Sequence, residues 1–80
     1  MPPRKPIRSE SQRSRLGAAI RVRRHELGLS QERLGELADC ERNYVGRVEQ
    51  GAHRIGLDIL LRIASALKTT LAQLAASARI

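Results

Sequence analysis

The feature that most constrains the fold is the stretch of residues 30–51, SQERLGELADCERNYVGRVEQG. Ser30 is a favourable N-cap, so a helix is predicted to begin at the residue that follows it. Leu34, Leu37 and Ala38 then recur at intervals of three and four residues, which places them on one face of that helix. The pattern predicts a short amphipathic helix followed at once by a sharp turn.

A second helix is predicted close to the first. Gly35 costs a helix about 1 kcal/mol relative to alanine, which indicates that the second helix passes too close for a larger side chain. Residues 39–41 are too few for anything but a tight turn, and Asp39 tolerates the left-handed backbone that such turns use. The second helix is therefore predicted over residues 42–50, with Gly51 as its C-terminal stop.

This second helix has an apolar side and a polar side. Val45 and Val48 point inward. The opposite side carries basic and amide side chains around one glycine: Arg42, Asn43, Gly46, Arg47 and Gln50. Arginine can hydrogen-bond guanine through two parallel bonds, and Asn or Gln can do the same with adenine. The polar side therefore suits a DNA major groove, and the alternative is an ordinary solvated helix face.

Length and composition agree with one small helical domain that binds a polyanion. The chain has 80 residues, a formal net charge of +7 and a single aromatic residue, Tyr44, so its core must be aliphatic. The charge alone does not distinguish DNA, RNA and an anionic membrane surface. No apolar run is long enough to cross a bilayer and no secretory signal follows the basic start. The single cysteine is compatible with a reducing compartment, so we expect a cytoplasmic protein without a membrane partner.

Taken together, the pattern resembles the lambda-repressor-like (XRE/Cro-type) helix-turn-helix family, which includes small phage repressors and restriction-modification controller proteins. The matching residues are Leu16, Ile20, Arg24, Gly28, Leu29, Ser30, Gln31, Glu32, Leu34, Ala38, Tyr44, Val45, Glu49, Gly51, Leu57, Ile63, Ala64, Ala66, Leu67 and Leu71. The resemblance implies an all-α, compact five-helix domain that binds double-stranded DNA as a homodimer.

The chain is predicted to have two parts. Residues 1–15 contain three prolines and five basic residues against one acid, which predicts a flexible basic arm; the alternative is a solubilising extension. Residues 16–80 form the DNA-binding domain. Its other helices are predicted near residues 12–27 and 57–67 and after Thr70, which should form a capping box with Gln73.

The resemblance also assigns roles to individual residues. Arg24 and Glu49 match a structural ion pair that fixes the second helix of the motif, and the alternative is a weak surface pair. Their place on the polar side of the second helix makes Arg42, Asn43 and Arg47 base-contacting candidates, and the resemblance adds Tyr44. The resemblance implies phosphate contacts at Gln31, His53 and Arg54, and the alternative for the last two is a solvated loop charge. Gln50, on the same polar side, and Arg33, which stands where the family often has Glu, are further phosphate-contacting candidates. Leu71 and Leu74 are expected at a dimer interface, unless they complete the core of one chain.

No catalytic, metal or cofactor site is expected. Cys40 stands where the family has a small apolar residue, and neither histidine lies at a ligand spacing from it. No nucleophile, paired-carboxylate or phosphate-loop motif is present, so we do not expect an enzyme. The expected function is sequence-specific regulation of transcription at a pseudo-palindromic operator, with a restriction-modification controller protein favoured. The alternatives are an antitoxin that binds a toxin protein and represses its own operon, and a non-specific nucleic-acid-binding protein.

Overall fold

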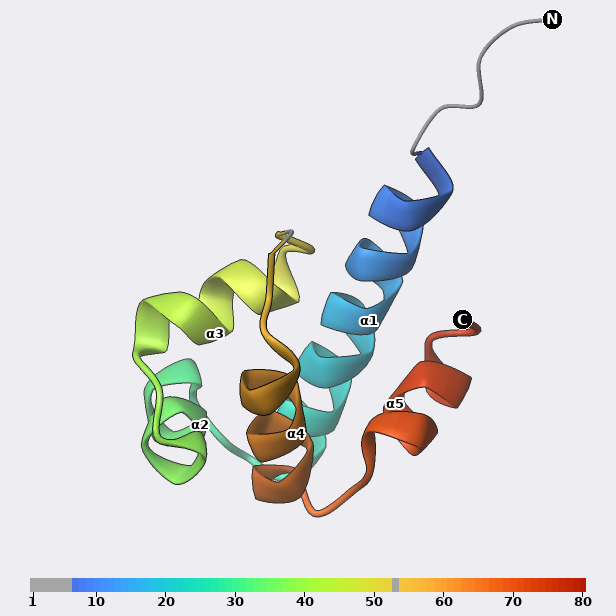
Figure 1. The fold of residues 1–80 in the computed structure, drawn as a ribbon. Coiled ribbons are helices and arrows are strands. Elements are labelled where there is room, and N and C mark those ends of the chain that lie inside the picture. Colours follow the sequence, from blue (N-terminus) through green and yellow to red (C-terminus); the bar gives the residue numbers. More distant parts are fainter. Residues whose placement is uncertain (1–6, 53) are drawn as a thin grey trace, which may run out of the picture.

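The computed structural model describes the backbone of residues 7–52 and 54–80, and the side chains from Ser11 onward within these ranges (Figure 1). The described residues form five helices and no strand, which confirms the predicted all-α fold. The helices are α1 (Ile7–Glu26), α2 (Gln31–Ala38), α3 (Arg42–Glu49), α4 (Leu57–Ala66) and α5 (Leu71–Ser77).

The five helices enclose one aliphatic core. Helix α1 contacts α3 on one side and α5 on the other, while α2 packs against both α3 and α4 (Figure 1). The largest fully buried side chains come from the first four helices and from the residue that follows α4: Ile20, Leu34, Val45, Ile63 and Leu67. Helix α5 adds Leu74, which is 4% exposed. Because every helix contributes a buried side chain, none can be removed without opening the core.

The predicted start of α1 near Gln12 is wrong. The helix begins at Ile7, so residues 7–11, which the sequence analysis placed in the arm ahead of the helix, are helical as well. No proline follows residue 6, and the polar residues of this segment are compatible with a helix. Residues 1–6, the remainder of the predicted arm, lie outside the described residues.

All five helices end in the same backbone arrangement, the Schellman motif. At the end of α3, for example, Ala52 N–H donates to the carbonyl of Arg47 (3.0 Å) and Gly51 N–H donates to the carbonyl of Val48 (3.0 Å). One residue at the end of each helix has a positive φ angle: Gly28 (68°), Asp39 (56°), Gly51 (82°), Lys68 (57°) and Arg79 (61°). Asp39 tolerates the left-handed backbone, whereas it is unfavourable for Lys68 and Arg79.

Three arginines support these helix ends with their side chains. Arg62 Nε donates to the carbonyl of Ala38 at the end of α2 (2.9 Å), and Arg23 Nε donates to that of Leu67 at the end of α4 (2.9 Å). Arg13 Nε donates to the carbonyl of Gly51 just after α3 (3.2 Å). A cation at a helix C-terminus satisfies unpaired carbonyls and complements the helix dipole. Part of the positive charge of the chain therefore stabilises its own fold.

Two helical glycines allow close backbone contacts. A Cβ atom on Gly35 would lie 2.6 Å from the carbonyl oxygen of Cys40 and 3.3 Å from the backbone nitrogen of Arg42, the first residue of α3. The closest neighbour of Gly35 is therefore the turn, whereas the sequence analysis had predicted the second helix. A Cβ atom on Gly17 would lie 2.5 Å from the carbonyl oxygens of Val48 and Glu49. Gly17 therefore determines how closely α1 crosses the C-terminal end of α3, a role that the sequence analysis missed.

In the described part of the chain, no single helix has the length and apolar composition needed to cross a membrane. Helices α4 and α5 meet those criteria only as a joined pair, and they are bent by 85° at their junction.

The strained helix end at Lys68 gives a stability prediction. Replacing Lys68 with glycine should relieve the left-handed strain of about 1–2 kcal/mol, part of which is offset by the greater flexibility of the unfolded chain. The free energy of unfolding in urea should therefore rise by about 0.5–1 kcal/mol. The matched control is Ser65→Gly, an exposed position with helical backbone in the last turn of α4, which should be destabilising. Destabilisation by Lys68→Gly would contradict this account of the helix end.

Candidate nucleic-acid interface

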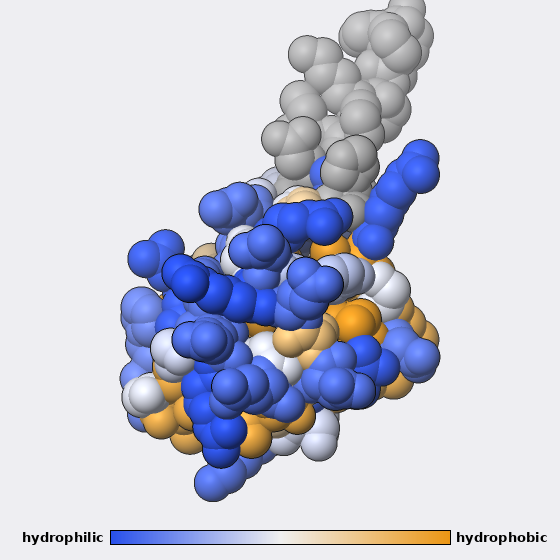
Figure 2. Space-filling view, turned by 90° about the vertical axis from the view of Figure 1, so that its left-hand side faces the viewer, coloured by the Kyte–Doolittle hydropathy of each residue, from blue (hydrophilic) through white to orange (hydrophobic). Residues whose placement is uncertain are grey.

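The polar side of α3 faces solvent. Arg42, Asn43, Arg47 and Gln50 are exposed, whereas Val45 and Val48 are buried. Figure 2 shows the side of the molecule that carries α2 and α3, and hydrophilic side chains dominate its surface there. Helix α3 therefore presents Arg42, Asn43 and Arg47 on an accessible surface, with the side chains of the first two at its N-terminal end.

A buried ion pair holds α3 from behind. Arg24 Nε lies 2.6 Å from Glu49 Oε2, and Arg24 Nη2 lies 3.0 Å from Glu49 Oε1. The two side chains are only 8% and 4% exposed. The hydrogen bond to Glu49, with a smaller Coulombic contribution, raises the pKa of Arg24 despite the opposing effect of burial. This bidentate pair joins the C-terminal half of α1 to the last residue of α3.

Gln31 and the loop after α1 complete the network around this pair. Arg24 Nη1 donates to the carbonyl of Leu29 (2.8 Å), and Gln31 Nε2 donates to Glu49 Oε1 (3.1 Å). The Gln31 side chain also lies over Gly46, where an added Cβ would be 3.7 Å from it. The start of α2 is thus tied directly to the middle and the end of α3.

Tyr44 supports Arg47 and the loop that precedes α4. The guanidinium carbon of Arg47 lies 5.6 Å from the centre of the Tyr44 ring, which is within the range of a cation–π contact. The amide N–H of Gly56 points to the Tyr44 hydroxyl oxygen at 3.5 Å. Tyr44 is half-buried and packs against the core. It therefore has less free surface for a base than Arg42, Asn43 and Arg47.

The candidate phosphate contacts surround α3. Gln50 is exposed at the C-terminal cap, and Arg54 is exposed in the following loop with a left-handed φ of 64°. Arg33 is exposed on α2, where its Nη1 lies 3.0 Å from Glu36 Oε1 in an ion pair accessible to water. His53 lies outside the described residues. Gln31, as described above, already bonds Glu49.

The two residues predicted at a dimer interface, Leu71 and Leu74, differ in how deeply they are buried. Leu74 is 4% exposed and belongs to the core of its own chain, so it has almost no surface to offer to a second copy. Leu71 is half-buried and lines a groove of about 450 Å³ between α4 and α5 together with Leu61. Leu61 and Leu57, one turn apart on α4, are 48% and 61% exposed. The exposed apolar surface of this region is therefore made by Leu57, Leu61 and Leu71.

Arg13 is a functional candidate that the sequence analysis placed in the arm. It is half-buried, and its Nε atom bonds the carbonyl of Gly51 at the start of the loop that carries Arg54. The Ser14 side chain lies against Gly51, where an added Cβ would be 2.8 Å from its hydroxyl oxygen. No local sequence signal distinguishes Arg13 from the other arginines near it.

Cys40 is half-buried against the core, and burial raises the pKa of its thiol. Among the described residues, no group of three His, Cys, Asp or Glu side chains is arranged to hold a metal ion.

Comparison with known proteins places this geometry in context. Residues 15–76 match the family described as "Helix-turn-helix domain". The fold is similar to the clp gene regulator ClgR from Corynebacterium glutamicum, with 26% identity over 85% of this chain and 87% of that chain and a TM-score of 0.80. It is also similar to the restriction-modification controller protein C.AhdI from Aeromonas hydrophila, with 38% identity over 76% of this chain and 92% of that chain and a TM-score of 0.73. Among curated protein sequences, none is significantly similar.

Because the Arg24–Glu49 pair is buried, we predict that two glutamate substitutions differ strongly in their effect on the free energy of unfolding. Glu49→Ala should lower the free energy of unfolding by about 3–5 kcal/mol, because it leaves the Arg24 charge buried without a partner. Glu36→Ala breaks only the exposed pair with Arg33 and should cost less than about 1 kcal/mol. Urea unfolding followed by circular dichroism measures both. Similar small costs for the two substitutions would show that the Arg24–Glu49 pair does not stabilise the fold.

Proposed function

The chain belongs to the lambda-repressor-like helix-turn-helix family, and on this premise we propose that it regulates transcription by binding a pseudo-palindromic DNA operator as a homodimer. The observation that supports the proposal is that α3 is exposed on one face and held in place on the other. Its outer face is polar and exposed, and its inner face is fixed by the core and by the Arg24–Glu49 pair. A recognition helix needs both properties, because base readout depends on a fixed position in the groove.

The proposed base contacts are made by Arg42, Asn43 and Arg47. Arg42 and Asn43 enter the major groove first, because the N-terminal residues of a recognition helix reach furthest towards the bases. Arg47 lies one turn after Asn43, and the Tyr44 ring restricts where its guanidinium group can go. Tyr44 contributes to the interface mainly by this support and through its exposed edge.

The proposed phosphate contacts come from both sides of the recognition helix. Gln31 and Arg33 lie in the first turn of α2, where backbone N–H groups also favour an anion. Gln50, His53 and Arg54 follow α3. Such contacts fix the register of the protein on the duplex and carry no sequence information themselves. Apart from Arg13, whose Nε atom bonds the Gly51 carbonyl, basic residues of the N-terminal segment add to the attraction for DNA.

The proposed dimer interface uses the apolar surface of α4 and α5. Leu57 and Leu61 provide apolar side chains that are exposed in the single chain, and the half-buried Leu71 adds a part of its surface. Pairing this surface across a two-fold axis would place two copies of α3 in successive major grooves, about 34 Å apart. The interface would also add buried apolar area to a domain whose own core is small.

Within this function, we favour a restriction-modification controller protein acting in the cytoplasm. The support is the similarity to C.AhdI, of which this chain covers 92%. The chain would act as a DNA-binding protein and not as an enzyme.

The test of the proposed function is a selection of bound fragments from randomised DNA, near physiological salt and with excess competitor duplex. A regulator of this kind should recover two half-sites about one helical turn apart. Arg47→Ala should then weaken binding to the selected site by about 1–3 kcal/mol and binding to random DNA far less. The control is Arg79→Ala, which removes the same charge beyond α5. Recovery of no motif would reject sequence-specific regulation.

The salt dependence of DNA binding distinguishes the proposed phosphate contact of Arg54 from the structural role of Arg13, which lies near the same loop. Arg54→Ala should weaken binding to all sequences alike and reduce the slope of log K against log salt by about 1, because one phosphate contact is lost. Arg13→Ala should leave this slope unchanged, since its Nε atom is bonded to the Gly51 carbonyl. Equal slopes for Arg54→Ala and the unmodified protein would exclude a phosphate contact at Arg54.

A further inference from the structure

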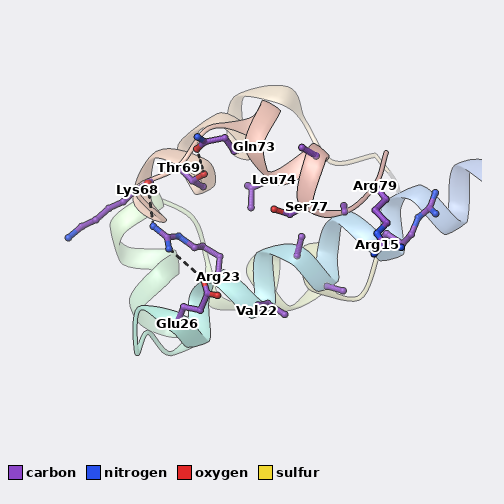
Figure 3. A pocket seen from close by; sticks show the side chains of 14 residues that line it. Arg15, Val22, Arg23, Glu26, Lys68, Thr69, Gln73, Leu74, Ser77 and Arg79 are labelled. Atoms are coloured by element: carbon purple, nitrogen blue, oxygen red, sulfur yellow. Dashed lines mark hydrogen bonds and ion pairs between the residues drawn. The ribbon is translucent and has the colours of Figure 1, made fainter.

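A groove lies between α1 and α5 (Figure 3). Helix α5 lies on the side of α1 that faces away from α3 (Figure 1). Its volume is about 810 Å³. The residues that line it on α1 extend from Arg15 to Glu26, which corresponds to about 16 Å of helix. Its lining includes Arg15, from the predicted basic arm, and the buried Leu74, but none of the other residues assigned above to DNA contacts and none of Leu57, Leu61 and Leu71.

The floor of the groove is apolar and shallow. Small residues line it from both helices, with Ala18 and Ala19 on α1 and Ala76 on α5. Val22 stands in the middle of the α1 wall and is 60% exposed. Small side chains on two neighbouring helices leave room for the side chains of a third helix, because ridges of one helix pack into the grooves of another. The shape therefore fits an apolar helix face about three turns long.

Both ends of the groove are basic. Arg15 and Arg79 lie together at one end, and Lys68 and Arg23 lie at the other (Figure 3). The one acidic residue of the lining, Glu26, is 3.4 Å from Arg23 Nη1. Arg15, Lys68 and Arg79 form no ion pair within the described part of the chain. A partner with carboxylates at the two ends of its apolar face would complement this arrangement.

We propose that the groove between α1 and α5 binds an acidic amphipathic helix of a partner protein. A second copy of this chain fits less well, because it would bring the same cations against Arg15, Lys68 and Arg79. DNA also fits less well, because alanines and valine line the floor where phosphate contacts would need donors. Since α3 lies on the other side of α1, the partner can bind while the recognition helix is on DNA. The proposal does not depend on the operator function.

The test is a selection of displayed random 16-residue peptides on the purified full chain. The recovered peptides should have apolar residues at intervals of three and four, flanked by Asp or Glu. Val22→Asp should weaken their binding at least about tenfold, because it places a charge in the centre of the interface. Val22 is exposed, so this variant should fold, which circular dichroism verifies.

Charge exchange provides the second measurement. Arg79→Glu should weaken the binding of a recovered acidic peptide about three- to tenfold. It should strengthen the binding of the same peptide with lysine in place of its acidic residues. The matched control is Arg33→Glu, which makes the same change on α2, outside the groove, and should leave peptide binding unchanged.

Three results would overturn the proposal. The first is a selection that recovers no peptide, and the second is recovered peptides that bind the Val22→Asp variant equally well. The third is sedimentation showing self-association that Val22→Asp abolishes, which would mean that a second copy covers the groove. None of these results bears on operator binding, so the two proposals can fail separately.

Discussion

The buried ion pair between Arg24 and Glu49 is the interaction on which the arrangement of the helices depends. Removing two charges from water is costly, and the cost is offset only when geometry and additional hydrogen bonds are good. Here the guanidinium group bonds both carboxylate oxygens and the Leu29 carbonyl, and Gln31 donates a further bond to Glu49. No buried side-chain polar atom of the described residues lacks a partner. The network fixes α3 relative to α1 and α2, so the outer face of α3 is free to specialise in recognition.

Positive charge has two separate uses in this chain. Arg13, Arg23 and Arg62 donate to carbonyls at the ends of α3, α4 and α2, where the helix dipoles favour a cation. These bonds join elements that are distant in the sequence, and they support a core that contains no large aromatic residue. The net charge of +7 therefore overstates the charge available to DNA. A protein can be strongly basic for structural reasons as well as for binding.

Features of the fold that depend on local signals could be predicted from the sequence. Ser30 and Thr70 accept the N–H groups of Arg33 and Gln73 as capping residues should, and α1, α2 and α3 end at Gly28, Asp39 and Gly51, which favour or tolerate a left-handed backbone. No such residue marks the ends of α4 and α5, where Lys68 and Arg79 adopt this backbone. The second half of the predicted capping box did not form, because the Gln73 side chain bonds the Thr69 hydroxyl instead. The start of α1 was missed for the opposite reason: a polar helix extension carries no distinctive signal.

Features that depend on which elements meet could not be predicted in this way. Periodicity places Leu74 on an apolar face, but only the packing of α5 shows that its own chain covers it. Gly17, like Gly35, is a glycine within a helix. Its role in the close approach of α1 and α3 becomes visible only because the end of α3 crosses α1 there. The family resemblance predicted that Arg24 and Glu49 pair with each other. The contact of Arg13 with the Gly51 carbonyl could be found only from the fold, which brings α1 against the end of α3. Helix α1 is consequently more than a support: one side fixes the recognition helix, and the other leaves a groove that the chain does not fill.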